Sequence, residues 1–481
     1  MKHYIESLLH SDDYQFLGLF VSDKTKEQGV FILRYLFYDI KNKKLNITEI
    51  DTRKEFPHID IPALDWYERE IHDMFGLVPK GHPNLRPLML FPENYPKDFH
   101  PLRKDANLNI EYRGYEEYRY ENFEPEGSFK ILVGPIHAGI IEPGHFRFTL
   151  NGEPILKLEI RHFYKHKGIE KLAEGKPVEF GLKLSERISG DHSLAHSLAF
   201  VKAVETIYGI DIPPKAVYVR AILLELERLT CNINDFAFIF QDVGYSFGAQ
   251  KVFAIKEMLM RLNEALTGNR FNRGIIKVGG ILKEIDLNIV KDGIKLLKKE
   301  YLKYKKLFLN SSTILERTDT TGKVSYETAK KYAALGYVAK ASGLYFDTRK
   351  IMENKLYGPL IKEFSLKSGD VTARLKVRFN DIEESFDIIE EFISNIPEGN
   401  IYKEVDCKNP QHSYSFGFEE GQRGNIIHML EIENGLISRW KIRDPSFHNW
   451  PIIQEAVLGD IIADFPLINK SLNLSYSGND L

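Results

Sequence analysis

A short polar stretch near the middle of the chain carries residue types that could do chemistry. Residues 187–196 read RISGDHSLAH, in which Asp191 precedes His192 and His196 follows four residues later. Two imidazoles at this spacing share one helix face, and with a carboxylate they could transfer protons or bind zinc or iron. Candidates for a further ligand are Asp444 and His448. Two histidines without a firm third ligand are more often core side chains, in which His192 fills volume and His196 makes a hydrogen bond among the helices. We therefore expect this chain to bind no metal.

A second concentration of ionisable residues lies in the stretch YEREIHDMFGLVPKGHPNLRPL, residues 67–88. Its first part has helical spacing, and Gly81, His82 and Pro83 follow at a turn. Read alone, the acidic and histidine side chains could be metal ligands. Charge clusters of this kind are more often ion pairs. We therefore expect an ion-paired helix that leads into an extended arm.

The composition excludes several classes of function. A formal net charge of -3 provides no basic surface for nucleic acid. The charged N-terminus does not resemble a signal peptide, and no long uncharged apolar run could span a membrane, so we expect a cytoplasmic chain. The two cysteines, Cys231 and Cys407, form no Cys-x-x-Cys motif. Thiolate-held zinc, iron–sulfur and nickel–iron sites are thereby excluded.

The pattern of residues predicts two domains of the α+β class. The first, residues 1–122, is an α/β domain with a β-rich run at 29–40, a helix at 64–77 and a proline-rich extended arm at 79–105. The charged stretch that ends in Pro-Glu-Gly near residue 127 contains the boundary.

The second domain, residues 123–481, is expected to be larger and mainly helical. Its N-terminal end is strand-rich, and Asn151-Gly152 predicts a hairpin turn between two strands. Apolar residues at three and four spacing predict helices, the last of them begun by an aspartate cap and stopped by a proline. These helices are expected at 215–241, 249–267, 286–310, 325–342 and 381–397. The tail after residue 440 is expected to be irregular.

The first domain resembles the small hydrophilic subunit of the quinone module of respiratory complex I. The elements Glu-Arg-Glu, Asp-Met-Phe-Gly and Gly-His-Pro occur in the order and spacing of that family. In the family this segment is a docking arm without catalytic residues. The resemblance assigns that role to Glu68, Arg69, Glu70, Asp73, Gly81, His82 and Pro83.

From about residue 130 the chain resembles the large subunit of group 4, energy-converting nickel–iron hydrogenases and its homologue in complex I. The resemblance rests on the motifs GPIHAGIIEPGHFRF, YKHKGIEKL, ILLELERL, LTGNRFNRGIIKVGG and VAKASG. Fusion of the two subunits is typical of formate-hydrogenlyase-type complexes. The resemblance implies a subunit of an ion-translocating oxidoreductase complex, peripheral on the cytoplasmic side of the cell membrane. It implies as partners an iron–sulfur small subunit and membrane-embedded complex I-like and antiporter-like subunits.

Nickel and iron in those hydrogenases are held by two Cys-x-x-Cys pairs, and this chain has lost all four cysteines. The matching positions are Ser189, His192, Ser475 and Gly478. Nickel needs soft thiolates, whereas a serine hydroxyl is hard and glycine has no side chain. The resemblance therefore implies that the chain binds no cofactor, cannot activate hydrogen, and receives electrons from an iron–sulfur cluster in an adjacent subunit.

Three hypotheses for the remaining cavity stay open. In the first, charge changes in the cavity couple electron transfer to ion transport, with proton-relay candidates His137, Glu142, His145 and Glu170, which could equally be structural ion pairs. In the second, the cavity reduces a small acceptor such as a quinone or a sulfur compound, with protons from Asp191 or His192. Ser189 and Gly190 replace the acid and tyrosine of the complex I quinone site, which disfavours the usual quinone chemistry. In the third, the chain is a catalytically silent scaffold.

Overall fold

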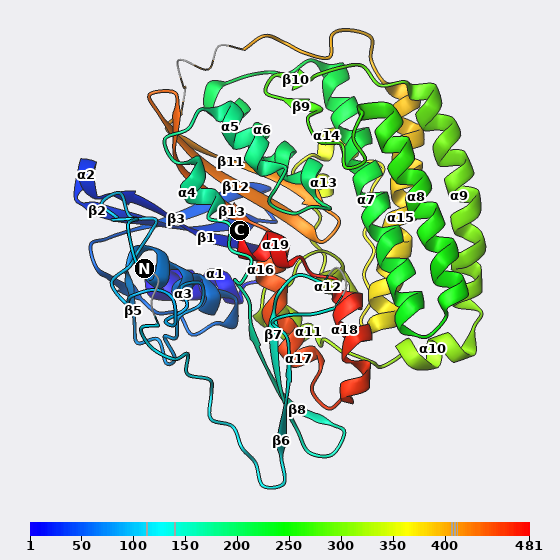
Figure 1. Ribbon diagram of the computed structural model, residues 1–481. Helices are drawn as coiled ribbons and strands as arrows, with labels where there is room; N and C mark the ends of the chain where they lie inside the picture. The colour runs from blue at the N-terminus through cyan, green and yellow to red at the C-terminus, as the bar shows by residue number, and fades with distance from the viewer. Residues whose placement is uncertain (112–113, 139–140, 406, 408–409, 411) are drawn as a thin grey trace.

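An antiparallel sheet of three strands forms the N-terminal part of the chain (Figure 1), in a computed structural model that describes residues 1–111, 114–138, 141–405, 407, 410 and 412–481. Its strand order is β1-β2-β3. The elements here are α1 (Lys2–His10), β1 (Tyr14–Lys24), α2 (Thr25–Gln28), β2 (Val30–Asp39), β3 (Lys44–Thr52), β4 (Glu55–Pro57), α3 (Pro62–Phe75) and β5 (Val78–Lys80). The β-rich run and the helix expected at 64–77 are thus confirmed.

Helix α3 begins and ends where its sequence dictates. Pro62 occupies the first turn, where its missing N–H costs nothing, and Gly76 ends the helix in the left-handed conformation with φ 71°. The side chains of Leu64, Tyr67 and Ile71 are buried against the rest of the N-terminal core. Helix α3 is therefore fixed at both ends and along one face.

The strand-rich start of the second part is a three-stranded antiparallel sheet, as expected. It consists of β6 (Phe129–Val133), β7 (His145–Leu150) and β8 (Ile155–Arg161). Asn151 and Gly152 lie in the turn between β7 and β8, and Gly152 has the positive φ, 66°, that this turn requires. The hairpin prediction is confirmed.

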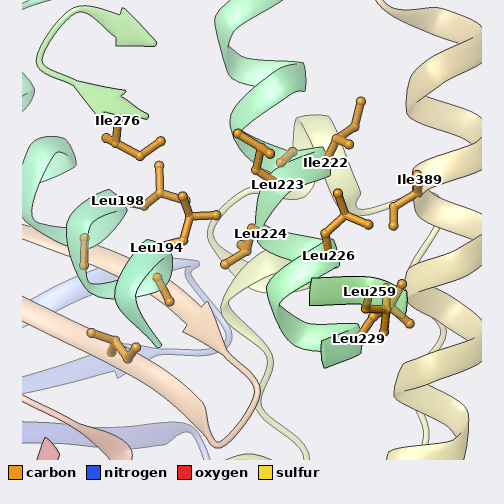
Figure 2. Packing of buried hydrophobic residues seen from close by; sticks show 14 of the residues in the cluster. Leu194, Leu198, Ile222, Leu223, Leu224, Leu226, Leu229, Leu259, Ile276 and Ile389 are labelled. Carbon is orange, nitrogen blue, oxygen red and sulfur yellow. The ribbon is translucent and has the colours of Figure 1, made fainter. Parts of the chain in front are cut away.

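Long helices form one side of the molecule, where α7, α8, α9 and α15 lie next to one another (Figure 1). Their bounds are α7 (Pro214–Asp242), α8 (Ser246–Thr267), α9 (Leu287–Leu309) and α15 (Val371–Asn395). Figure 2 shows how leucines and isoleucines of α7, α8 and α15 meet those of α6 (Ser193–Tyr208) in a continuous apolar core. Three-residue and four-residue spacing predicted these helices because it places their apolar side chains on one face.

Two expected helices differ from the observed ones. The helix expected at 381–397 starts ten residues earlier, because Asp370 rather than Asp381 is its cap and accepts a hydrogen bond from the Ala373 N–H at 2.8 Å. The helix expected at 325–342 is broken into α11 (Tyr326–Lys331) and α12 (Gly336–Ala341). Gly336 has φ 57°, and a Cβ there would lie 2.1 Å from the backbone oxygen of Arg423. The break lets the two backbones approach closely.

The C-terminal part has more regular structure than expected. A third antiparallel sheet of three strands consists of β11 (Tyr414–Gly421), β12 (Gly424–Glu433) and β13 (Leu436–Arg443). Short helices follow it: α16 (Pro445–Asn449), η1 (Trp450–Ile452), α17 (Ile453–Ala456), η2 (Ile462–Asp464), α18 (Phe465–Leu472) and α19 (Tyr476–Asp480). The remaining elements are α4 (Ile169–Ala173), α5 (Val178–Ser185), β9 (Ile276–Lys277), β10 (Gly280–Ile281), α10 (Ser312–Thr318), α13 (Thr348–Ile351) and α14 (Asn354–Tyr357). The α+β class is confirmed.

The N-terminal sheet packs against the C-terminal one through charged side chains. Arg34 on β2 binds Glu431 on β12 at 3.0 Å, and Lys24 on β1 binds Glu433 at 2.7 Å. Arg439 on β13 donates a hydrogen bond to the Val21 backbone oxygen at 3.0 Å. Two apolar clusters include residues of both sequence halves, and one of them joins Leu17 and Phe20 to Ile427. The halves thus share a core, and the boundary at 122/123 stays a prediction.

Candidate functional site

Three of the four positions that the resemblance assigns to metal-binding cysteines lie in contact. Ser189, between α5 and α6, and Ser475, between α18 and α19, have their Oγ atoms 3.0 Å apart. The Gly478 N–H donates a hydrogen bond to Ser475 Oγ at 2.8 Å. His192 precedes the first residue of α6, and its Nε2 lies 3.5 Å from Nη1 of Arg423. Segments almost 300 residues apart in the sequence are therefore joined by hydroxyl hydrogen bonds.

An ion pair between Asp191 and Arg423 adjoins these hydroxyls. The guanidinium Nη2 and Nη1 lie 2.5 and 3.2 Å from the two carboxylate oxygens, and Ser189 Oγ donates to Asp191 Oδ1 at 2.7 Å. Arg423 also donates to the Asn473 backbone oxygen. The Arg423 side chain is 4% exposed, whereas that of Asp191 is 41% exposed. The Asp191 carboxylate therefore faces a cavity of about 420 Å³, and the buried Arg423 guanidinium holds this carboxylate in place.

Asp191 and His192 do not titrate near neutral pH. Desolvation raises the pKa of Asp191, but the adjacent charge and hydrogen bonds of Arg423 lower it more, so the pKa lies well below its usual range. Burial lowers the pKa of His192 to about 3, and Arg423 adds to the effect. Near neutrality Asp191 is a fixed anion and His192 a neutral imidazole, which suits positioning better than proton donation.

The residues at these positions do not fit a nickel–iron centre. The donor set consists of two hydroxyls, an imidazole and a glycine, and none of these supplies a thiolate. A Cβ at Gly478 would lie 2.5 Å from Oδ2 of Asp444, which is closer than van der Waals contact allows. Asp444 is itself held by the Ser446 N–H at 2.7 Å. The backbone at 478 thus leaves no room for a cysteine unless Asp444 moves.

The histidines of the opening motif hydrogen-bond within the core instead of converging on a shared ligand. His196 Nε2 lies 3.1 Å from Asp444 Oδ2, and its Nδ1 lies 3.0 Å from Nε2 of His428. His448 lies apart from them, with its Nε2 2.8 Å from the hydroxyl of Tyr67. His196 is therefore a hydrogen-bonded histidine inside the core, which was the alternative to a metal ligand.

Two titratable groups beside the cavity were missed by sequence reasoning. Glu227 on α7 accepts hydrogen bonds from the Leu194 and Ala195 N–H groups at 2.7 and 3.0 Å, and burial raises its pKa to about 8. Lys167 donates to backbone and hydroxyl oxygens of Ser477, and burial lowers its pKa to about 8. Both residues lie in the family motifs ILLELERL and YKHKGIEKL. An acid within an apolar helical run was the available signal for Glu227.

The four expected relay residues occupy different environments. Glu142 lines the cavity and accepts a hydrogen bond from the Ser477 N–H at 2.9 Å. His137 and His145 instead bind backbone oxygens of the β6–β7 connection at 2.7 and 3.1 Å. Glu170 is buried between α4 and β13, where it binds Arg439 at 2.8 Å. The structure thus brings only Glu142 of these four described residues to the cavity.

The residues assigned to a docking arm make contacts within the chain. Asp73 Oδ2 accepts hydrogen bonds from the N–H groups of Leu88, Met89 and Leu90 at 2.8, 2.8 and 3.2 Å. Arg69 donates to the backbone oxygens of Arg86 and Pro87, and Glu70 binds Lys441 on β13. Gly81 and Pro83 are exposed at a turn, with the His82 side chain directed inward at 1% exposure. Contact with another subunit stays a prediction for this segment.

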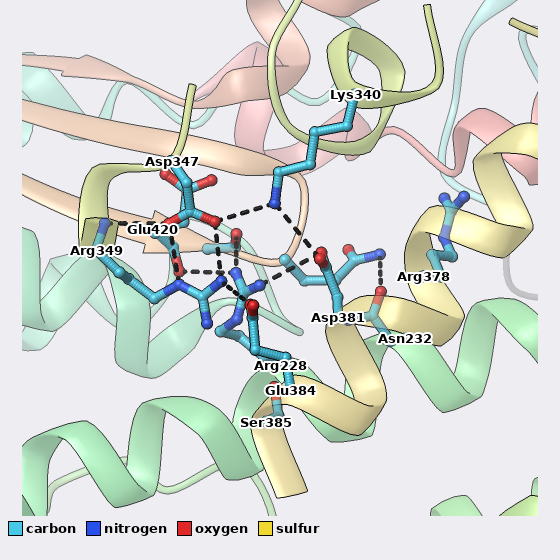
Figure 3. A network of polar contacts seen from close by, with 12 residues as sticks. Arg228, Asn232, Lys340, Asp347, Arg349, Arg378, Asp381, Glu384, Ser385 and Glu420 are labelled. Carbon is cyan, nitrogen blue, oxygen red and sulfur yellow. Dashed lines mark hydrogen bonds and ion pairs between the residues drawn. The ribbon is translucent and has the colours of Figure 1, made fainter. Parts of the chain in front are cut away.

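A network of buried charges joins α7, α12, α15 and β11 (Figure 3). Arg228 on α7 donates to the Gly421 backbone oxygen at 2.7 Å, two residues from Arg423, and lies 3.4 Å from Asp381. Lys340 binds Asp381 at 3.4 Å and Asp347 at 3.0 Å. Further members are Arg349, Glu225, Glu384 and Glu420. Burial raises the pKa values of Glu384 and Glu420 to about 7, so two members titrate near neutral pH.

Comparisons with known proteins identify families and relatives of this chain. Residues 3–112 match the family described as the 30 Kd subunit of respiratory-chain NADH dehydrogenase, and residues 242–416 match the 49 Kd subunit. Formate hydrogenlyase subunit 5 of Escherichia coli is 34% identical, over 96% of this chain and 84% of its own length. Hydrogenase-4 component G of the same organism is 33% identical, over 90% of this chain and 77% of its own length.

A solved structure extends the comparison. The archaeal membrane-bound sulfane sulfur reductase contains a chain with 25% sequence identity and a TM-score of 0.70, which aligns over 74% of this chain and 99% of that one. Among the described residues here, no helix is long and apolar enough to cross a membrane. The chain therefore belongs to the family of oxidoreductase-complex subunits, represented by formate hydrogenlyase subunit 5, in which parts related to the 30 Kd and 49 Kd subunits of NADH dehydrogenase form one polypeptide.

Proposed function

We propose that this chain carries the redox-linked cavity of an ion-translocating, membrane-associated complex, and that the cavity works without a nickel–iron centre. One observation carries the proposal: Ser189, Ser475 and Gly478 meet beside the Asp191–Arg423 pair at an open cavity. The chain has the family's fold around the cavity. The hydroxyls of Ser189 and Ser475 and the Asp191–Arg423 ion pair occupy the place where the family's hydrogenases hold metal.

Partner subunits supply the redox cofactor and the membrane attachment. An iron–sulfur cluster in an adjacent subunit delivers electrons, and membrane-embedded complex I-like and antiporter-like subunits hold the complex on the cytoplasmic side of the membrane. The support is that relatives include a membrane-bound hydrogenase subunit of Pyrococcus furiosus and a chain of a respiratory membrane complex.

Coupling proceeds through groups whose charge responds to an electron near the cavity. Arg423 stabilises negative charge that develops there, since its guanidinium is fixed in place before the event. Glu227 and Lys167, whose pKa values are about 8, are mostly protonated at pH 7, so either group can donate a proton toward the added negative charge. A change of charge at the cavity affects the buried network through Arg228, which donates a hydrogen bond to the Gly421 backbone oxygen, two residues from Arg423.

A second candidate function is reduction of a small acceptor inside the cavity. The cationic side chains of Arg273, Arg423 and Lys470 line the cavity, so an acceptor that becomes anionic on reduction would be stabilised. The structural relative is named as a sulfane sulfur reductase, which favours a sulfur compound as the acceptor class, with a quinone as the alternative. Lys167, whose pKa is about 8, would supply a proton.

Metal analysis of the purified complex tests the central claim. Because the cavity offers no thiolates, we expect nickel far below one equivalent per chain and no hydrogen evolution from reduced methyl viologen. Elemental analysis by mass spectrometry measures the first, and gas chromatography the second. Stoichiometric nickel that survives gel filtration would refute the proposal, since some other donor set would then hold it.

The role of Glu227 predicts a specific pH dependence. A carboxyl with a pKa of about 8 is protonated at pH 7 and ionises above that, so the electron-transfer rate should fall as the pH rises through about 8. Glu227→Gln should lower the rate and flatten its profile between roughly pH 7 and pH 9. Initial rates with reduced methyl viologen as donor, measured across this range in membrane vesicles, check the prediction.

The exposed glutamate on α5 gives a matched control. Glu179→Gln makes the same chemical change at the surface and should leave the profile as in the wild type. The free energy of unfolding provides an independent readout. Because the pKa of Glu227 is higher in the folded chain than the value of about 4.3 in the unfolded chain, its contribution to stability is complete below about pH 4.3 and is lost as the pH rises toward 8. An unaltered profile in Glu227→Gln would exclude this residue as the proton donor.

A further inference from the structure

Two histidines and a glutamate that do not line the cavity of Asp191 and Arg423 converge in the N-terminal half. His58 directly follows β4 and His82 follows β5 by two residues, and these strands pair in parallel with Pro57 opposite Lys80. The His58 N–H also donates to the Lys80 backbone oxygen at 3.3 Å. Strand pairing therefore sets the two imidazole rings side by side, with centroids 4.8 Å apart.

Helix α3 directs two carboxylates at these rings. Glu68 Oε2 lies 2.6 Å from His58 Nδ1 and 4.0 Å from His82 Nε2. One ligand atom from each of the three residues lies within 4.8 Å of the others. Asp65, three residues earlier on the same helix face, places its Oδ1 3.3 Å from His82 Nε2. The four residues together offer two imidazole nitrogens and two carboxylate oxygens, which is a donor set that zinc takes.

The cluster is buried and incompletely compensated. The Glu68 side chain is fully buried, and desolvation raises its pKa despite the hydrogen bonds from His58 and from the Ile59 N–H. The Nε2 of His82 is buried, and its contacts among the described residues are with carboxylate oxygens of Asp65 at 3.3 Å and Glu68 at 4.0 Å. Two carboxylates at a largely buried site call for positive charge, since a buried anion is costly unless it is paired. A divalent cation would supply that charge and would accept electron pairs from His58 Nδ1 and His82 Nε2.

We infer that His58 Nδ1, Glu68 Oε2, His82 Nε2 and Asp65 Oδ1 bind one zinc ion. A cavity of about 280 Å³, lined by His58 and Asp65, gives access. Binding at His82 Nε2 puts the ring proton on Nδ1 and breaks its exposed hydrogen bond from the Asn84 N–H, 3.2 Å long. The proton between His58 Nδ1 and Glu68 is released to solvent. The ion ties β4, α3 and the start of the proline-rich arm together.

Zinc titration of the full chain tests the site. Chelator-treated protein is titrated with Zn²⁺ against a chromophoric competitor, and with Co²⁺ to record its visible absorption. We expect one equivalent of Zn²⁺, the intense visible bands of four-coordinate Co²⁺, and a higher Tm with Zn²⁺ present. His58→Ala and His82→Ala should each weaken Zn²⁺ binding by at least about tenfold and remove the Tm shift.

A neighbouring histidine serves as control. His72 lies on the same helix but its Nδ1 is 3.7 Å from Asp73, outside the cluster, so His72→Ala should bind Zn²⁺ as the wild type does. Asp65→Asn, at a partly exposed side chain, tests the fourth ligand in case the histidine variants fail to fold. Wild-type protein without saturable Zn²⁺ binding at micromolar concentration overturns the inference, as does equal affinity in His72→Ala and Asp65→Asn. Electron transfer is not measured, so the result is independent of the cavity's function.

Discussion

Replacement of Arg423 by alanine is expected to lower electron transfer by at least about 100-fold, the usual cost of removing a fixed donor that stabilises developing charge. The guanidinium holds both oxygens of Asp191, at 2.5 and 3.2 Å, and anchors the backbone of Asn473 next to the cavity. Its loss frees the acid and leaves the cavity floor without its buried cation. Rates of decylubiquinone and polysulfide reduction by reduced methyl viologen, measured in membranes, give the size of the effect and identify the acceptor class.

Two further variants separate chemistry from scaffolding. Arg423→Lys keeps the charge but loses the planar fork that binds both oxygens, so an intermediate rate is expected. Arg187→Ala removes an exposed arginine near the same motif and should retain the wild-type rate. An assembled complex with Arg423→Ala that still works at full speed would favour the silent-scaffold hypothesis.

The largest loss of stability is expected from Arg349→Ala. This arginine is fully buried and binds Asp347 and Glu225, each at 2.9 Å, and Glu384 at 3.1 Å. Removing one partner of a buried ion pair costs about 3–5 kcal/mol, because the remaining charge stays buried and unpaired. Three carboxylates lose a partner here, although Asp347 keeps Lys340 and Glu225 keeps Arg228, so the cost should lie within that range. The midpoint of urea unfolding, followed by far-ultraviolet circular dichroism, measures it.

An exposed ion pair gives the comparison. Arg261 binds Glu257 at 2.9 Å with a side chain that is 75% exposed, and Arg261→Ala should cost no more than about 1 kcal/mol. A loss of similar size in both variants would show that the buried network contributes no more than a surface pair. Arg349→Met, which fills part of the volume, separates lost charge pairing from lost packing.

Sequence reasoning succeeded where local patterns decide the structure. Asn151-Gly152 specified its hairpin because few residues accept the required backbone conformation. Helix α3 was predicted because its apolar residues recur at helical spacing, and Pro62 and Gly76 then set the bounds that the structure shows. The start of α15 was misplaced because Asp370 and Asp381 are equally good caps by type, and only packing against the chain around Thr321 distinguishes them.

Contacts between residues that lie far apart in the sequence could not be predicted from the residue pattern of single segments. Nothing in the run EEGQRGN indicates that Arg423 meets Asp191 more than 230 residues away. The metal interpretation of residues 67–88 lacked its decisive member, His58, because strand pairing rather than spacing brings that ring to Glu68 and His82. The break at Gly336 is likewise set by a contact with the Arg423 backbone and not by local propensity.

The charged contact between the N-terminal and C-terminal sheets has a consequence for synthesis on the ribosome. Lys24 and its partner Glu433 are separated by 409 positions in the chain. At 5–20 residues per second, the partner emerges roughly 20–80 s after the first sheet is complete. During that interval Lys24 lacks Glu433, Arg34 keeps Glu49 but lacks Glu431, and the apolar face beside them lacks its C-terminal partners Phe416, Ile427 and Met429. The nascent chain therefore presents a chaperone-binding surface whose lifetime is set by translation speed.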